Sequence, residues 1–140
     1  MVVAPEWEAY DRLRFYTLDH GDPSFIHQHV VDAFAAQNAD AQTKPISLIF
    51  ALVGLYLHVE ERRTGRQIQQ VHMRLARGHR GPWPSVVLPV DRGAITVSDV
   101  VAADEGPLRD LAIERWCASV WAAYIDSRPA VIDLLSRLWR

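Results

Sequence analysis

The apolar residues of this chain recur every three to four positions over most of its length, and strand-like alternation is nearly absent. This spacing is typical of α-helices that turn one face toward a core. We therefore expect an all-α fold, a single compact helical bundle of about six helices in one domain over residues 1–140. The segments predicted to be helical are residues 6–18, 23–38, 45–58, 65–77, 96–106, 107–126 and 127–140.

Two kinds of local signal mark the starts of four of these helices. An N-cap side chain with a proline in the first turn marks two of them. A capping box, in which the cap and the third helical residue bond to each other's backbone, marks the other two. In chain order, the pairs are Asp22–Pro23, Thr64–Gln67, Thr96–Asp99 and Ser127–Pro129.

Two segments depart from an ordinary amphipathic pattern. Residues 45–58 are apolar on almost every side, which predicts the central helix of the bundle. Residues 78–95 contain three prolines and three glycines and predict a long irregular loop, with a short extended piece at residues 86–88. Loops of this length often serve as functional lids or caps.

Composition limits the classes of function. The 140 residues are 49% hydrophobic and 23% charged, with a net charge of −2, as in a soluble globular protein without a strong electrostatic pull toward nucleic acid. The basic stretch at residues 62–80 lacks interleaved aromatic residues, so we expect a solvated face there and no nucleic-acid partner. Cys117 is the only cysteine and is expected to be buried and inert. No signal peptide and no membrane-length apolar run are recognised, so a cytoplasmic protein without a membrane partner is expected.

Several polar side chains fall on apolar helix faces. In residues 23–38, His27 and Gln37 project from the apolar face, while His29 and Asp32 lie together at its edge. His27 and Gln37 are ten residues apart, roughly 15 Å along a helix, so each needs its own partner.

The next two helices continue this theme. A stripe of small residues, Ser47, Ala51 and Gly54, ends at His58 and would allow close approach of another helix or a ligand. A glycine inside a helix costs about 1 kcal/mol relative to alanine, so Gly54 is expected to have a packing reason. His72 lies within the apolar stripe of residues 65–77.

Three consecutive helices thus each place a histidine on the core side, and three interpretations follow. His27, His58 and His72 could bind a divalent metal, zinc or iron, with an open position for water or substrate. Alternatively, they are core histidines, each bonded to a carboxylate or carbonyl. The third interpretation is a metal-free acid–base pocket. Asp32, and Glu60 or Glu61, are the candidate carboxylates, as ligands or as hydrogen-bond partners of the rings.

The chain resembles a bacterial family of small proteins of unknown function. The resemblance covers residues 23–126 and rests on His27, Asp32-Ala33-Phe34, Gln37, the "GLYLHVEE" of residues 54–61, a proline-flanked aromatic at Trp83, "ITVSDV" at 95–100 and "WCASVWAAY" at 116–124. The family pattern implies a compact helical fold and maps onto His27, Asp32, Gln37 and Glu60. It does not include His29, His58 or His72. Many relatives end the long helix with paired histidines, and "IDSRPAV" here has none. The family brings no established activity.

Together, these features predict a polar-lined pocket within the bundle, near His27, His58 and Glu60, that binds a small molecule and acts on it. The predicted catalytic residues are His27, Asp32 and Glu60. The predicted ligand-binding residues are Gln37, Gly54, Tyr56, Trp116 and Trp121. The alternative is a non-catalytic interaction or homodimerisation module with structural histidines, since the central helix is apolar all round and tryptophans are numerous.

Overall fold

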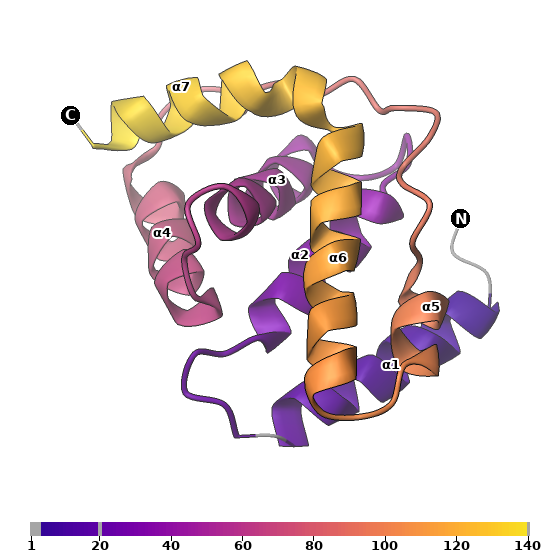
Figure 1. The fold of residues 1–140 in the computed structure, drawn as a ribbon. Helices are drawn as coiled ribbons and strands as arrows, with labels where there is room; N and C mark the ends of the chain where they lie inside the picture. Colours follow the sequence, from indigo (N-terminus) through magenta and orange to yellow (C-terminus); the bar gives the residue numbers. More distant parts are fainter. Residues whose placement is uncertain (1–3, 20, 140) are drawn as a thin grey trace.

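The structure is a computed structural model that describes residues 4–19 and 21–139. Within these residues it contains seven α-helices, one 3₁₀ helix and no β-strand, which confirms the predicted all-α class (Figure 1). The elements are α1 (Ala4–Asp19), α2 (His27–Gln37), α3 (Pro45–Val59), α4 (Gly65–Gly78), α5 (Val97–Ala102), α6 (Pro107–Ala123), η1 (Ile125–Ser127) and α7 (Arg128–Leu138).

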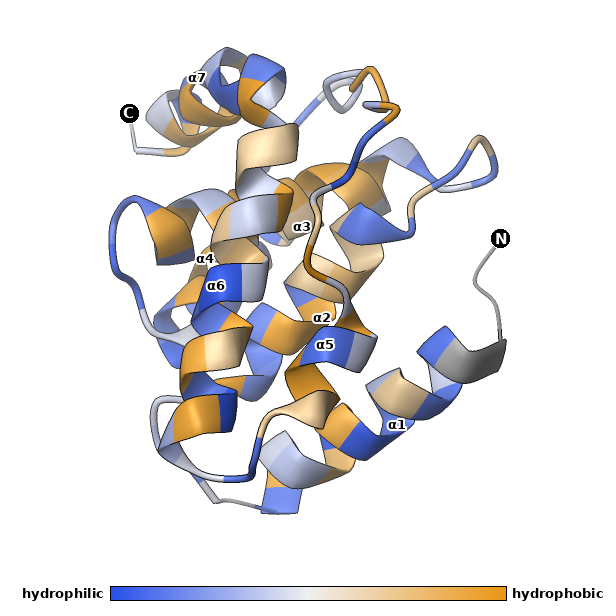
Figure 2. Ribbon diagram, turned by 45° about the vertical axis from the view of Figure 1, so that its right-hand side comes forward, coloured by the Kyte–Doolittle hydropathy of each residue, from blue (hydrophilic) through white to orange (hydrophobic). Residues whose placement is uncertain are grey.

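The helices pack around α3, as its apolar sequence predicts. Leu52, Val53 and Leu55 of α3 are fully buried. α2 packs along α3, and α6 crosses both, so these three helices form the centre of the molecule (Figure 1). α4 and α7 cover one side of α3, while α1 and α5 pack together at the other end. Apolar residues gather on the faces that these helices turn toward one another (Figure 2).

The predicted capping boxes are present at the starts of α4 and α5. Thr64 and Gln67 satisfy each other's backbone N–H groups, and Thr96 and Asp99 do the same. These signals worked because both partners lie within one helical turn, so the sequence contains the whole interaction.

The predicted start of α2 at Pro23 is wrong, since the helix begins at His27. The Asp22 carboxylate accepts hydrogen bonds from the backbone N–H groups of Ser24 and Ile26, at 2.9 and 3.1 Å. Phe25 has a φ of 63°, in the left-handed region, which interrupts any helix that crosses it. Asp22 therefore closes a turn that precedes the helix.

One other local prediction fails. Ser127 occupies the N-cap position of α7, but its side chain makes no capping hydrogen bond. Residues 79–96 contain no helix or strand, as predicted for a long irregular loop. The expected end of the last helix, at residue 140, lies outside the described residues.

The long loop between α4 and α5 is tied to the core by Gln37. Its side-chain N–H group donates to the carbonyl oxygens of Ile95 at 2.7 Å and Arg92 at 3.3 Å. Its carbonyl oxygen accepts from the indole N–H of Trp116 at 2.8 Å. One amide thus joins α2, α6 and the loop, and satisfies the indole of a fully buried tryptophan.

We predict that Gln37→Leu lowers the free energy of unfolding by about 2–4 kcal/mol, because it leaves a buried indole N–H and a loop carbonyl without partners. Urea denaturation measures the change. Gln42→Leu, at an exposed position, is the matched control and should stay within about 0.5 kcal/mol of the unmodified chain. Equal losses in the two variants would contradict the assigned role of Gln37.

Candidate functional site

The site begins where Asp32 of α2 packs directly against Gly54 of α3. A Cβ atom built on Gly54 would lie 1.8 Å from Oδ2 of Asp32, far inside van der Waals contact. Only glycine therefore lets the Asp32 side chain rest against α3. This is the packing reason that the sequence suggested for Gly54.

The Asp32 carboxyl group is buried, with 3% of the residue exposed. Oδ1 accepts a hydrogen bond from the side-chain amide of Gln28 at 3.0 Å, and Oδ2 has no partner among the described residues. Burial raises the pKa of Asp32 well above its ordinary value of 3.8, because an apolar surrounding disfavours the carboxylate. Asp32 is thus an acid that the fold holds in the protonated form well above that pH.

One turn along the same two helices, His29 of α2 stacks on His58 of α3. The ring centroids are 3.6 Å apart and the planes differ by 15°. Burial lowers the pKa of His29 to about 3, and the adjacent His58 ring acts in the same direction. Burial also lowers the pKa of His58. The pair is therefore uncharged near pH 7, and each ring offers one hydrogen-bond donor and one acceptor.

Cys117 of α6 packs against this region without adding reactivity. Its thiol donates to the backbone oxygen of His29 at 3.6 Å, and burial raises its pKa. The thiolate is the nucleophilic form of cysteine, so this side chain is inert at neutral pH, as expected from the sequence.

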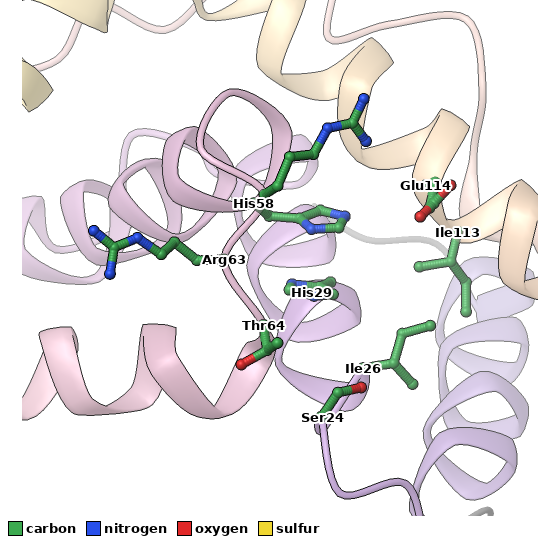
Figure 3. Close-up of a pocket in the computed structure, with 9 residues that line it drawn as sticks. Ser24, Ile26, His29, His58, Arg63, Thr64, Ile113 and Glu114 are labelled. Carbon is green, nitrogen blue, oxygen red and sulfur yellow. The ribbon is translucent and has the colours of Figure 1, made fainter.

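The stacked rings line a cavity of about 210 Å³, which we call the imidazole pocket. In Figure 3, the His58 ring points toward Ile113 and Glu114 of α6, His29 lies face to face with it, and Arg63 extends away from both rings. The lining residues come from α2, α3, α6 and the connections next to them: Ser24, Ile26, His29, His58, Arg62, Arg63, Thr64, Ile113 and Glu114.

The structure does not bring the three predicted metal ligands together. The Nδ1 atom of His27 lies 2.9 Å from the Thr17 hydroxyl, and the Nε2 atom of His72 lies 2.8 Å from the Phe50 carbonyl oxygen. His58 instead pairs with His29. Within residues 4–19 and 21–139, no group of three or more His, Cys, Asp or Glu side chains is placed to hold a metal. The predicted set for zinc or iron therefore shares no coordination point.

Glu60, predicted to orient His27, lies in a different network. Its carboxylate accepts hydrogen bonds from the indole of Trp121 at 2.8 Å and from Arg128 at 2.9 Å. The Arg128 hydrogen bond lowers the pKa of Glu60. The neighbouring Glu61 accepts from the Tyr56 hydroxyl at 3.1 Å. These contacts fasten the end of α3 to α6 and α7 and lie apart from the imidazole pocket.

The predicted ligand-binding residues contact other parts of the chain, and none of them lines the imidazole pocket. The five residues are Gln37, Gly54, Tyr56, Trp116 and Trp121. The sequence pattern placed His29 at the edge of a helix face, assigned Arg62 to the solvated basic stretch of residues 62–80, and gave no signal for Glu114. The missing information is tertiary, because these residues meet only when α6 crosses the end of α3.

These features define a small all-helical protein with a histidine-lined pocket between three central helices. The chain belongs to a family of unknown function, DUF5946, whose model matches residues 6–125. This confirms the resemblance to an uncharacterised family. No curated protein and no solved structure matches the chain. None of the described helices has both the length and the apolar character required to cross a bilayer.

We predict that Asp32→Asn becomes progressively more stable than the unmodified chain as the pH rises above about 3.8. Below that pH the carboxyl group is protonated in both the folded and unfolded states and its titration contributes nothing. Above that pH, the carboxyl group of Asp32 ionises in the unfolded chain but stays protonated in the folded one. The free energy of unfolding of the unmodified chain therefore falls by at most about 1.4 kcal/mol per pH unit, until the pH passes the folded-state pKa of Asp32. Asparagine keeps an acceptor for Gln28 and removes the titration.

Urea denaturation of both proteins between pH 4 and pH 8 measures this difference. Asp126→Asn, on an exposed side chain, is the control and should change stability by no more than about 0.5 kcal/mol. Parallel stability curves for Asp32→Asn and the unmodified chain would contradict the assigned protonation of Asp32.

Proposed function

We propose that this protein binds a small polar molecule in the imidazole pocket, and that the His29–His58 pair recognises it. The observation that carries the proposal is a stacked pair of uncharged imidazoles lining a cavity of about 210 Å³. Uncharged imidazole both donates and accepts hydrogen bonds, and near pH 7 it can also accept a proton.

A comparison with the other core histidines supports a binding role for His29. His27 and His72 each have a polar atom of the protein within 2.9 Å of one ring nitrogen, as structural histidines do. The buried Nδ1 atom of His29 has no partner among the described residues. A buried polar atom without a partner costs about 1–3 kcal/mol, a cost that a structural role alone does not explain.

The size of the cavity limits the ligand. The imidazole pocket has a volume of about 210 Å³. This volume is below the range of about 300–1,000 Å³ that is typical for drug-sized ligands. The proposed ligand is therefore a metabolite-sized molecule, well short of a nucleotide.

The same pair supports a catalytic extension of the proposal. Because the pKa of His58 is lowered, the ring is unprotonated near pH 7 and is a suitable general base for a bound molecule. Two uncharged imidazoles are also ligands for zinc or iron, so a divalent metal belongs among the compounds to be tested.

The test is a binding screen with small carboxylates, amines, amino acids, polyols, Zn²⁺ and Fe²⁺, read by NMR on protein with ¹⁵N-labelled histidine. A bound compound should shift the ring resonances of His29 and His58. His58→Ala should weaken its affinity by at least about tenfold, the effect of about 1.4 kcal/mol. His79→Ala, on a ring that stacks on Trp83 outside the pocket, should leave the affinity unchanged. A screen in which no compound shifts either pocket ring would refute the proposal.

The second candidate function is an interaction module that pairs with another copy of the chain. Leu108 and Leu111 of α6 are 61% and 40% exposed and line a second cavity, of about 490 Å³, between α5 and α6. Asp104 and Arg115 lie on the same cavity. Opposite charges on one patch suit a two-fold interface, in which each copy meets the reverse arrangement.

Light scattering during gel filtration, over a hundredfold range of concentration, tests this second candidate. A dimer that Leu108→Lys converts to a monomer would support it. A monomer at every concentration would refute it.

A further inference from the structure

Arg62, at the mouth of the imidazole pocket, holds a backbone conformation that is costly for arginine. Its φ is 58°, in the left-handed region, at the turn where the N–H of Arg63 donates to the carbonyl oxygen of Leu57 at 2.9 Å and closes α3. Glycine is the usual residue at this position of a helix end. Any residue with a Cβ atom costs about 1–2 kcal/mol more there.

The helix-end hydrogen bond explains the backbone conformation, but no side-chain contact within the described residues explains why arginine adopts it. The Arg62 side chain is exposed and makes no hydrogen bond or ion pair with the described residues. Its neighbour Arg63, by contrast, lies 3.5 Å from the carboxylate of Glu61. The helix-end hydrogen bond requires this backbone conformation but not an arginine side chain, so the presence of arginine is a reason to look for a ligand of that side chain.

Glu114 provides the opposite charge on the same pocket. It comes from α6, lines the cavity together with Arg62, and has no hydrogen bond or ion pair with the described residues. Burial has the largest effect on the pKa of His58 and lowers it; Glu114 acts against burial and raises this pKa, while Arg62 acts with burial and lowers it. The two groups therefore flank one ring without neutralising each other by direct contact.

The remaining lining consists of Arg63, the hydroxyl residues Ser24 and Thr64, and an apolar part. Ile26 and Ile113 lie on the side away from Arg63 (Figure 3). Ile113 is fully buried. Between the two charges, the pocket thus offers uncharged imidazoles on one side and aliphatic carbon on the other.

We infer that the ligand is a small zwitterion with a short apolar body, of the α-amino acid class, with its carboxylate on Arg62 and its ammonium group on Glu114. This inference rests on the proposed function of the imidazole pocket. A ligand with only a positive charge would be repelled by Arg62, and a ligand with only a negative charge would be repelled by Glu114. Only a molecule with both charges satisfies both groups, and the isoleucines accept its side chain.

The test compares three molecules that share the same branched four-carbon body. L-Valine carries both charges, isobutylamine lacks the carboxylate, and isovalerate lacks the ammonium group. By calorimetry at low salt and pH 7, L-valine should bind at least about tenfold more tightly than either analogue, as expected for one added charge-assisted hydrogen bond. Glycine, L-alanine and L-leucine measure how long an apolar body the pocket accepts.

Two substitutions assign the charges. Arg62→Gly should reduce the affinity for L-valine about tenfold, to that for isobutylamine, without lowering Tm, because glycine favours the left-handed backbone. Glu114→Gln should reduce it to the affinity for isovalerate. Arg77→Gln, on an exposed arginine of α4 that does not line the pocket, is the control and should retain the affinity for L-valine.

The outcomes separate this inference from the proposed function. A single-charge analogue that binds as tightly as every amino acid tested would overturn the zwitterion, as would an Arg62→Gly variant with unchanged affinity or a lowered Tm. In those cases, His29 and His58 ring shifts with another compound would still support the pocket. If no compound shifts either ring, the proposed function fails together with the inference.

Discussion

The close contact between α2 and α3 at Asp32 and Gly54 is the constraint on which the rest of the site depends. Because a Cβ atom at position 54 would overlap the Asp32 carboxyl group, the two helix axes can approach this closely only with glycine there. The contact also fixes the register of the pair. One turn toward the start of α2 and one turn toward the end of α3, the same register places His29 on His58.

This arrangement costs stability. Asp32 is buried with one oxygen unpartnered, and His29 is buried with one nitrogen unpartnered. The fold tolerates both because each side chain is uncharged near neutral pH, since burial raises the pKa of the acid and lowers that of the base. Burying the same groups in charged form without a partner would be far more expensive. The apolar core of α3 and its neighbours supplies the stability that offsets the remaining cost.

The sequence predicted those parts of the structure whose interactions are local. The capping boxes at Thr64 and Thr96 and the apolar centre of α3 were readable because each pattern lies within a few residues. The start of α2 was misplaced because Asp22 supports a helix cap and a turn equally well, and the left-handed backbone at Phe25 decided between them. The sequence around Phe25 does not indicate that this residue adopts a left-handed backbone.

The site was harder to predict, for a geometric reason. Helical periodicity shows which face a histidine occupies, but not which side chain from another helix it meets. His27 and His72 do face inward, yet each meets a nearby hydroxyl or carbonyl group. His29 was assigned to the edge of its helix face, and it is buried because His58 and Cys117 pack on it.

The residues through which the chain resembles its family mostly hold the scaffold together. Gln37 fastens the long loop, Glu60 fastens the end of α3, and Asp32 sets the approach of α2 to α3. His58 and His29 lie outside that pattern, although they line the pocket. The proposed ligand site thus uses the residues around the stacked rings, while the contact of Asp32 with Gly54 accounts for why the rings meet.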